Sequence, residues 1–271
     1  MPEWPEMETY RNQLAGKIAG ARILEAEVTR EKSVNLPPQE FKSETEGRTI
    51  WFVEHRGKYL LFHLDNGKRL LLHLMLGGWI YYGEGDDAPT GTAQVVLRLQ
   101  NGSLYFCGLR LGYLHLLTVK EVTARLTELG PEPFDPRLTP ERFRSRYAGK
   151  RGKLKSALID QAAVAGMGGC YSDEIAFAAG VRPTAAMSAL SGETWTKLYA
   201  SMQAVLRRAV EYGGYMEKPL YQGDALTGGY NDRCMVYDRG GEPCLQCGTP
   251  IVQTEVSSRK AFYCPECQGE A

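Results

Sequence analysis

Apolar and polar residues alternate in short runs over the first 120 or so residues, which is the pattern of half-buried β-strands. Turn-forming residues such as Asp65-Asn66-Gly67 and Asn101-Gly102 separate the runs. Many short strands joined by tight turns indicate a β-sandwich or a β-barrel. The predicted strands cover residues 22–29, 48–54, 59–64, 69–74, 79–82, 94–99, 103–107 and 113–118.

Helical patterns stand on both sides of this β-rich region. Pro5 opens a predicted helix over 5–18, whose first turn carries Glu6 and Glu8, where the positive end of a helix favours them. A stiff, proline-rich linker over 129–136 precedes the second group of helices. These helices are predicted over 140–147, 154–162, 171–179 and 193–212, before a glycine-rich loop over 213–229. The fold class is therefore α+β.

Four cysteines near the C-terminus form two CxxC pairs, Cys244 with Cys247 and Cys264 with Cys267, sixteen residues apart. This is the spacing of a structural four-cysteine zinc site. Since β-forming residues fill the interval, we expect one Zn²⁺ to clamp a β-hairpin with Arg259 near its tip. Two disulfides are the alternative, which a reducing compartment would disfavour.

The chain has 271 residues with 32 basic and 32 acidic side chains, so its net charge is zero. Zero net charge argues mildly against a nucleic-acid partner, but residues 142–155 hold seven basic side chains and no acidic one. Such a run can bind a phosphate backbone or form a solvated helix face. The glycines of segment 164–171 could bring N–H groups and a helix N-terminus to a phosphate, or could form only a tight corner.

The length of the chain allows two domains with separate cores. No apolar run is long enough to span a membrane, and residues 1–6 are unlike an export signal. We therefore expect a cytoplasmic protein with no membrane partner, and we expect it to be a monomer.

The order and spacing of several motifs resemble the formamidopyrimidine-DNA glycosylase and endonuclease VIII family of bacterial base-excision repair enzymes. The motifs, which together span nearly the whole chain, are MPEWPEMETYR, RGKYLLFHL, LKSALIDQAAVAGMGGCYSDEIAFAAGVRP and VYDRGGEPCLQCGTPIVQTEVSSRKAFYCPECQ. The resemblance implies a β-sandwich domain headed by a catalytic helix over 1–130, a helix-two-turn-helix domain over 131–230 and a zinc finger over 231–271. It also implies that damaged DNA is the partner.

The resemblance further implies an unusual nucleophile. Once Met1 is removed, the secondary amine of Pro2 would attack the sugar C1′, expel the base and form an iminium ion. Glu3 would assist opening of the sugar ring and shuttle protons, and Glu6 would support Glu3. Elimination of the flanking phosphates would nick the strand, so that one site would serve as glycosylase and lyase.

Other positions match DNA-phosphate or catalysis-supporting residues of the family. Lys58 matches a phosphate-binding lysine, although it could also be a solvated lysine at a strand end. The remaining matches are His73, Arg110, Lys155, Gly169, Tyr171 and Arg259. Each has an ordinary structural alternative when taken singly, such as a core histidine for His73.

The chain departs from the family pattern in its recognition loops. Leu76 replaces a methionine that fills the hole left by the extruded base, Leu109 replaces an arginine that faces the orphaned base, and Leu111 replaces a phenylalanine wedge. Gly169 replaces a phosphate-binding asparagine. Leucines fill space but cannot hydrogen-bond a base. Since extrusion costs roughly a few kcal/mol, we expect an atypical lesion preference and better action on single-stranded or distorted DNA.

Two other functions remain open from the sequence. A protein of the same fold could bind damaged DNA without excising it, and the lost recognition residues favour that function. A zinc-ribbon scaffold for nucleic acid, unrelated to repair, is the second. The presence of Pro2, Glu3 and Lys58 favours the enzyme.

Overall fold

The computed structural model describes residues 1–270 and divides them into two compact units. Unit 1 consists of Met1–Thr127 and Met216–Gly229, and unit 2 of Glu128–Tyr215 and the chain from Tyr230 onward. The loop after residue 215, which the sequence analysis assigned to the second domain, therefore packs in unit 1. The reason is Leu220, which is fully buried in the core of unit 1 and whose carbonyl accepts a 2.6 Å hydrogen bond from the Tyr82 N–H.

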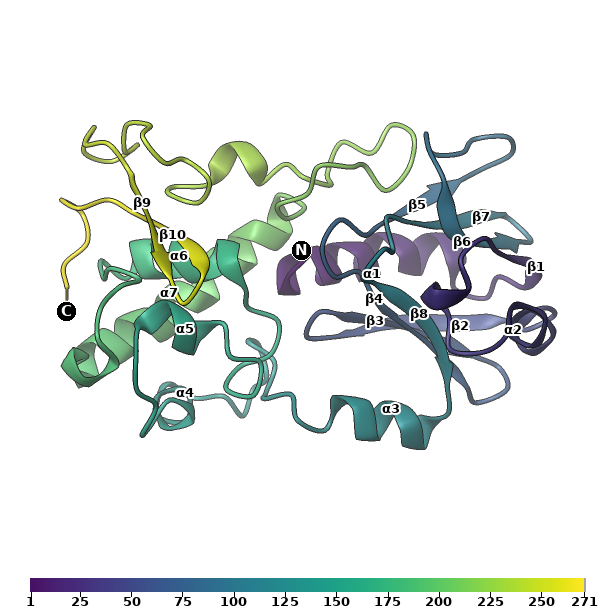
Figure 1. Cartoon of the computed structure of the whole chain (residues 1–271), viewed down its shortest axis with the longest axis horizontal. Coiled ribbons are helices and arrows are strands. Elements are labelled where there is room, and N and C mark those ends of the chain that lie inside the picture. Colours follow the sequence, from purple (N-terminus) through teal and green to yellow (C-terminus); the bar gives the residue numbers. More distant parts are fainter. Residues whose placement is uncertain (271) are drawn as a thin grey trace. The chain divides into compact units, whose positions relative to one another are not determined.

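Unit 1 is built on two antiparallel sheets of four strands, in the orders β1-β6-β7-β5 and β2-β3-β4-β8 (Figure 1). Each strand lies where the alternation of apolar and polar residues predicts one, so the β-rich first part is confirmed. The strands are β1 (Ile23–Val28), β2 (Ile50–Arg56), β3 (Tyr59–Leu64), β4 (Arg69–His73), β5 (Trp79–Gly83), β6 (Ala93–Leu99), β7 (Gly102–Cys107) and β8 (Tyr113–Leu117).

The two sheets bury their facing sides against each other. Phe62 of β3 meets Phe106 of β7 edge to face, with 5.9 Å between ring centroids. Helix α1 (Trp4–Ile18) adds Tyr10 and Leu14 to the same core and packs against β2 and β3. Two short helices, α2 (Pro38–Thr45) and α3 (Val119–Leu126), were not predicted, since eight residues give too few turns for a clear helical period.

Unit 2 contains helices α4 (Pro140–Arg146), α5 (Leu154–Leu158), α6 (Gly169–Ala178) and α7 (Gly192–Glu211), and the hairpin of β9 (Val252–Val256) and β10 (Arg259–Tyr263). It also has single 3₁₀ turns at Met187–Ala189 and Asn231–Arg233, and unit 1 has one at Glu31–Ser33. Helix α5 is shorter than predicted because Gln161 closes the turn that follows it. The Gln161 amide donates to the Met167 carbonyl at 2.7 Å, and its Oε1 accepts from the Gly166 N–H at 2.9 Å.

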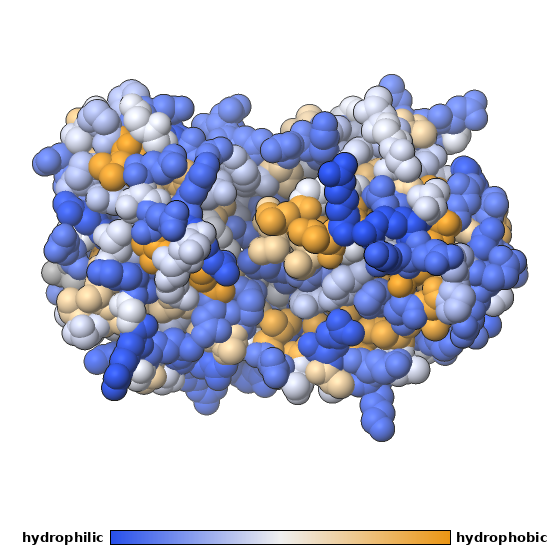
Figure 2. Space-filling view, in the orientation of Figure 1, coloured by the Kyte–Doolittle hydropathy of each residue, from blue (hydrophilic) through white to orange (hydrophobic). Residues whose placement is uncertain are grey.

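None of the helices within residues 1–270 is both long and apolar enough to cross a membrane. The face drawn in Figure 2 is mostly hydrophilic, and its apolar residues lie in separate patches. Among the large apolar side chains that are exposed, Leu76 and Leu111 belong to the loops that the sequence analysis singled out.

Candidate active site and metal centre

The start of α1 brings two carboxylates together. The Glu3 N–H donates to Glu6 Oε2 at 2.6 Å, so Glu6 caps the backbone of the residue that follows Pro2. The side chains of Glu3 and Glu6 are 4% and 1% exposed. Acids at a helix start are normally solvated, and their burial here favours a functional role over simple capping. The structure thus places Pro2, Glu3 and Glu6 at one helix start.

Two contacts fasten the first turns of α1 to the end of β2. Trp4 meets His55 edge to face at 5.2 Å, and His55 Nε2 lies 2.8 Å from Glu8 Oε2. Burial by itself would raise the pKa of Glu8, but the hydrogen bonds of its carboxylate with His55 and Arg11 lower the pKa to about 2. Glu8 is therefore ionised at neutral pH and holds this corner in place.

Lys58 lies in the two-residue turn between β2 and β3. Gly57, at the first central position of the turn, has a φ of 56°, which a residue without a Cβ adopts without strain. Lys58 is only 7% exposed. This burial contradicts the alternative of a solvated lysine at a strand end.

His73 ends β4 and pairs with Tyr59 of β3. The Met75 N–H donates to His73 Nδ1 at 3.2 Å, so the neutral ring carries its proton on Nε2. Burial and the positive charge of Lys58 lower the pKa of His73 to about 4. His73 is therefore a neutral histidine with a satisfied Nδ1, and its ring lies close enough to Lys58 to be affected by that charge.

The register of the sheet explains why these residues meet. Arg56 pairs with Tyr59, Tyr59 with His73, and His73 with Tyr113, so β2 ends, β3 begins, β4 ends and β8 begins at one end of the sheet. Loops 74–78 and 107–112 leave from this same end. We call it the site end of unit 1.

The three leucines of the recognition loops do not share one environment. Leu76 and Leu111 are 64% and 61% exposed. Arg110, which stands between Leu109 and Leu111 in the sequence, is exposed as well. Leu109 is 0% exposed and belongs to the core of unit 1. The expectation that Leu109 fills space beside an orphaned base is therefore wrong for this conformation, because its side chain points into the sandwich.

In unit 2, Lys155 is 1% exposed and its Nζ lies 2.7 Å from Asp173 Oδ2 and 2.9 Å from the Gly169 carbonyl. Tyr171 is also fully buried, and its hydroxyl accepts from the Tyr215 N–H at 3.2 Å. The Lys155 ammonium and the Tyr171 hydroxyl are thus engaged within unit 2, and contact of either side chain with a DNA phosphate stays a prediction. Lys155 holds the turn at the start of α6 through the Gly169 carbonyl, and Tyr171 joins α6 to the chain that follows α7.

Gly169 begins α6, and a Cβ built on it would have no atom within 4 Å. A side chain at this position would therefore meet open space. A longer residue at position 169 could therefore extend its side chain outward, whereas the glycine of this protein offers only its backbone groups.

Two buried acids that the sequence analysis did not single out connect α6 to the C-terminal region. Asp173 Oδ2 accepts from the Phe262 N–H of β10 at 3.1 Å, in addition to its ion pair with Lys155. Glu174 accepts from the N–H groups of residues 235, 236 and 237, each at 2.9 Å. Burial raises the pKa of Asp173 to about 7, although Lys155 acts to lower it. The sequence did carry a signal for this role, because Asp173 and Glu174 are adjacent within an otherwise apolar helix. Acids that are buried in such a helix need charged or hydrogen-bonding partners.

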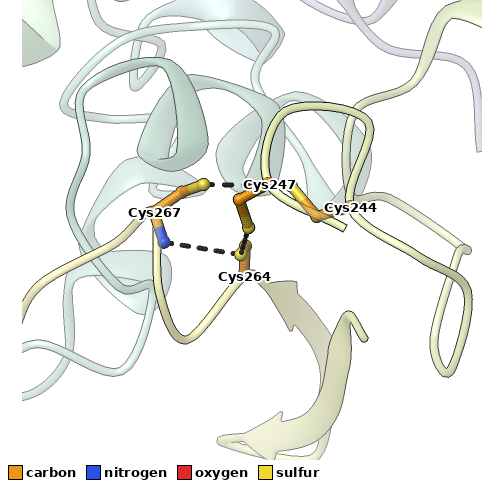
Figure 3. Close-up of side chains that lie close together, drawn as sticks. All are labelled: Cys244, Cys247, Cys264 and Cys267. Atoms are coloured by element: carbon orange, nitrogen blue, oxygen red, sulfur yellow. Dashed lines mark hydrogen bonds between the residues drawn. The ribbon is translucent and has the colours of Figure 1, made fainter. Parts of the chain in front are cut away.

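The four cysteines of the CxxC pairs converge, and their sulfur atoms all lie within 4.8 Å of one another (Figure 3). The Cys244–Cys267 and Cys247–Cys264 sulfur distances are 3.9 and 3.4 Å. Disulfides require about 2.0 Å, whereas four thiolates about 2.3 Å from a central ion lie roughly 3.8 Å apart. The donor set fits tetrahedral zinc, and the disulfide alternative is excluded.

The zinc-bearing hairpin presents Arg259 at its tip. Ser257 and Ser258 form the turn with φ values of 50° and 60°, and Arg259 follows as the first, exposed residue of β10. The Ser257 hydroxyl lies 3.0 Å from that of Ser156 in α5, so the tip touches the helix-two-turn-helix element.

Comparison with known proteins covers almost the entire chain. Residues 1–113 match the formamidopyrimidine-DNA glycosylase N-terminal domain, residues 129–218 the H2TH domain of the same enzyme, and residues 241–269 the zinc finger found in FPG and IleRS. A formamidopyrimidine-DNA glycosylase of Symbiobacterium thermophilum is 38% identical over 99% of this chain and 89% of its own length. That of Bacillus licheniformis is 35% identical over 99% of both chains. This chain belongs to the formamidopyrimidine-DNA glycosylase family.

Solved structures of the family agree. Lactococcus lactis Fpg in complex with DNA containing an abasic site matches with a TM-score of 0.90 and 29% identity, over 98% of this chain and 99% of that one. The complex of the same wild-type enzyme with DNA containing N7-benzyl-Fapy-dG matches with a TM-score of 0.90 and 30% identity over the same shares. The α+β fold class and the structural zinc of this family member are thereby confirmed.

The basic run over 142–155 is not one solvated face in this glycosylase-family chain. Arg146 donates to the Ala163 carbonyl at 3.1 Å, Lys150 forms an ion pair with Asp160, and Lys155 is buried. These side chains close the loops around α5. The exposed members of the run are Arg142, Arg144, Arg146, Arg151 and Lys153.

We expect Cys247→Ser to reduce bound zinc from one equivalent per chain to a small fraction, because serine is a poor ligand in a thiolate site. The hairpin and Arg259 should lose their fixed position, while unit 1 keeps its amide NMR spectrum. Metal analysis and NMR measure both effects. Cys107→Ala, which removes a buried thiol of unit 1, is the control and should retain zinc. Full zinc occupancy in Cys247→Ser would contradict the assigned ligand set.

We expect Lys155→Met or Asp173→Leu to reduce the free energy of unfolding by about 3 to 5 kcal/mol, since each leaves one buried charge without its partner. The double variant should be more stable than either single one, although the Phe262 N–H then loses its acceptor at a cost of about 1 to 3 kcal/mol. Urea denaturation of the three variants tests this coupling. Losses that simply add would show that the two side chains act independently.

Proposed function

We propose that this chain is a bifunctional DNA glycosylase and abasic-site lyase of base excision repair, with Pro2 as its nucleophile. Membership of the family supports the glycosylase activity and damaged DNA as the partner. The observation that carries the proposed site is the buried pair of Glu3 and Glu6 directly after Pro2, at a helix start fixed to the site end of unit 1.

The chemistry begins when removal of Met1 turns the Pro2 nitrogen from an amide into a secondary amine. Its lone pair forms a bond to the sugar C1′, and the bond from C1′ to the base breaks as the base leaves with a proton. The nitrogen then loses its proton, and its freed lone pair forms the C=N bond of the iminium ion as the bond from C1′ to O4′ breaks. Glu3 supplies the proton that O4′ takes up when the sugar ring opens.

The iminium ion makes the C2′ protons acidic, which leads to strand cleavage. Removal of one C2′ proton expels the 3′ phosphate and forms a carbon–carbon double bond. A second elimination expels the 5′ phosphate. The glycosylase and lyase steps therefore use the same nitrogen, and the Glu3 carboxylate is the base nearest in sequence.

Positive side chains of each unit would bind the DNA backbone. Lys58 at the site end and exposed Arg110 are the candidates in unit 1, and Arg259 on the zinc hairpin is the candidate in unit 2. Each would neutralise a phosphate and release a counterion. Lys155 would act by holding the start of α6, and Tyr171 by joining α6 to the chain that follows α7.

The lesion preference is the atypical part of the proposal. Leu76 and Leu111 are exposed and apolar, whereas Leu109 is buried, so no leucine of these loops reads the opposite base. We therefore propose action on single-stranded or already distorted DNA, and on several lesions regardless of the opposite base. The same features favour a second candidate, a protein that binds damaged DNA without excising it.

Borohydride reduction should trap this protein covalently on DNA with an abasic site, because it reduces the iminium ion to a stable amine. Pro2→Gly should trap poorly, since a primary amine on a flexible residue replaces the ring nitrogen. Pro38→Gly, at the start of α2, is the control and should trap like the unchanged protein. Gel electrophoresis of trapped complexes measures this. Equal trapping by protein with a blocked N-terminus would move the chemistry to a lysine, first to Lys58, and no trapping at all would favour the non-catalytic binder.

A panel of oxidised bases, each in single-stranded DNA and opposite all four bases, tests the lesion preference. We expect excision rates opposite the four bases to differ by less than about tenfold, because bidentate base readout is worth about 1 to 3 kcal/mol and is absent. Intact mass should first establish that Met1 is removed. A strong preference for 8-oxoguanine opposite cytosine would show that other residues replace the missing reader.

A further inference from the structure

Loop 107–112, which carries Leu111, is held by a side chain from a distant part of unit 1. Arg30 lies between β1 and the 3₁₀ turn at Glu31–Ser33. Its Nη1 donates to the Leu109 carbonyl at 3.3 Å and its Nη2 to the Arg110 carbonyl at 3.1 Å. One guanidinium therefore binds the carbonyls of the two residues that precede the exposed leucine.

Two further side chains complete the binding of Leu109. The Ser33 hydroxyl donates to the same carbonyl at 3.4 Å, and the Leu109 N–H donates to Gln94 Oε1 at 2.9 Å. Ser33 and the side chain of Leu109 are both 0% exposed. Every polar backbone atom of Leu109 thus has a side-chain partner, and its own side chain is an apolar anchor in the core.

Glycines join this loop to loop 74–78, which carries Leu76. A Cβ on Gly108, whose φ is 66°, would lie 2.0 Å from the Gly77 carbonyl oxygen, and a Cβ on Gly112 would lie 2.6 Å from that of His73. The two loops therefore touch backbone to backbone. Leu76 and Leu111 therefore project from two loops that are in contact with each other, and Arg30 binds one of these loops.

The order of this loop affects how easily a side chain on it can separate stacked bases in a duplex. An exposed leucine on a loose loop would lose rotational and loop freedom when it entered a base stack, and that loss would oppose insertion. A loop that is already ordered avoids this loss. Single-stranded DNA needs little unstacking, so the benefit should be confined to duplex substrates.

We propose that Arg30 is a positioning residue that presets loop 107–112, so that Leu111 acts as a wedge during base extrusion from duplex DNA. The inference rests on the proposed function for its substrate. It adds a functional residue that lies outside the recognition loops. It also makes the buried Leu109 side chain an anchor of the loop, whereas a side chain that reads a base at this position would have to point outward.

The test compares Arg30→Met with the unchanged protein. Methionine retains much of the apolar stem and removes the donors to the two carbonyls. Excision from duplex DNA should fall roughly tenfold, the effect of losing about two hydrogen bonds, while cleavage of single-stranded DNA with an abasic site stays within about twofold. Arg98→Met is the matched control, because it removes an exposed arginine of the same unit, whose Nη2 lies 2.7 Å from Glu27 Oε1. It should change neither rate.

A double variant shows whether Arg30 acts through the wedge. Leu111→Ala should itself reduce duplex excision, and Arg30→Met added to it should cause little further loss. Arg30→Lys, which can reach one carbonyl, should recover part of the duplex rate. Equal losses on single-stranded and duplex DNA, or losses in the double variant that multiply, would mean that Arg30 only stabilises the fold, and would overturn the inference.

Fluorescence of 2-aminopurine placed beside an abasic site separates this inference from the proposed function, since it reports unstacking without chemistry. At saturating protein, the duplex probe should brighten with the unchanged protein and less with Arg30→Met. If the unchanged protein brightens the probe more than Arg30→Met does, but never traps or excises, the glycosylase proposal is refuted and the role of Arg30 is supported. Equal brightening by both proteins would refute the role of Arg30.

Discussion

The register of β2, β3, β4 and β8 is the constraint on which the candidate active site depends. Antiparallel pairing puts the end of one strand beside the start of the next, so the turn with Lys58 and the ring of His73 come to one edge. Trp4 and Glu8 then fasten the start of α1 to the same edge through His55. A slip of one residue would reverse the faces of the strands and scatter these groups.

Unit 2 has a large apolar core around α4 to α7, but only a small apolar cluster lies beside the zinc hairpin. The metal orders the hairpin, and buried charges join the hairpin to the helices. Asp173 binds Lys155 of α5 and the backbone of β10 at the same time, while Glu174 takes three N–H groups from one loop. Buried charges are costly unless paired, so these contacts specify one arrangement more than they add stability.

The loops at the site end carry side chains that differ from the family pattern, while the fold is that of the family. At position 109 a leucine turns into the core, where an arginine would have to stay at the surface. The exposed apolar residues Leu76 and Leu111 remain, supported by backbone contacts between glycines. A rigid apolar projection can separate bases without identifying them, which is consistent with a broad choice of lesions.

The sequence by itself determined the strands of the sandwich, four helices of unit 2, and the zinc ligands, because alternation, helical period and CxxC spacing are local patterns. The resemblance of its motifs indicated the family and the residues at the start of α1. Tertiary structure decided the rest. Lys155 is the buried ion-pair partner of Asp173, and the Leu109 side chain is buried in the core of unit 1. The segment Met216–Gly229 packs in unit 1, where Leu220 is buried in the core. These outcomes depend on partners far away in the chain, and no local pattern records them.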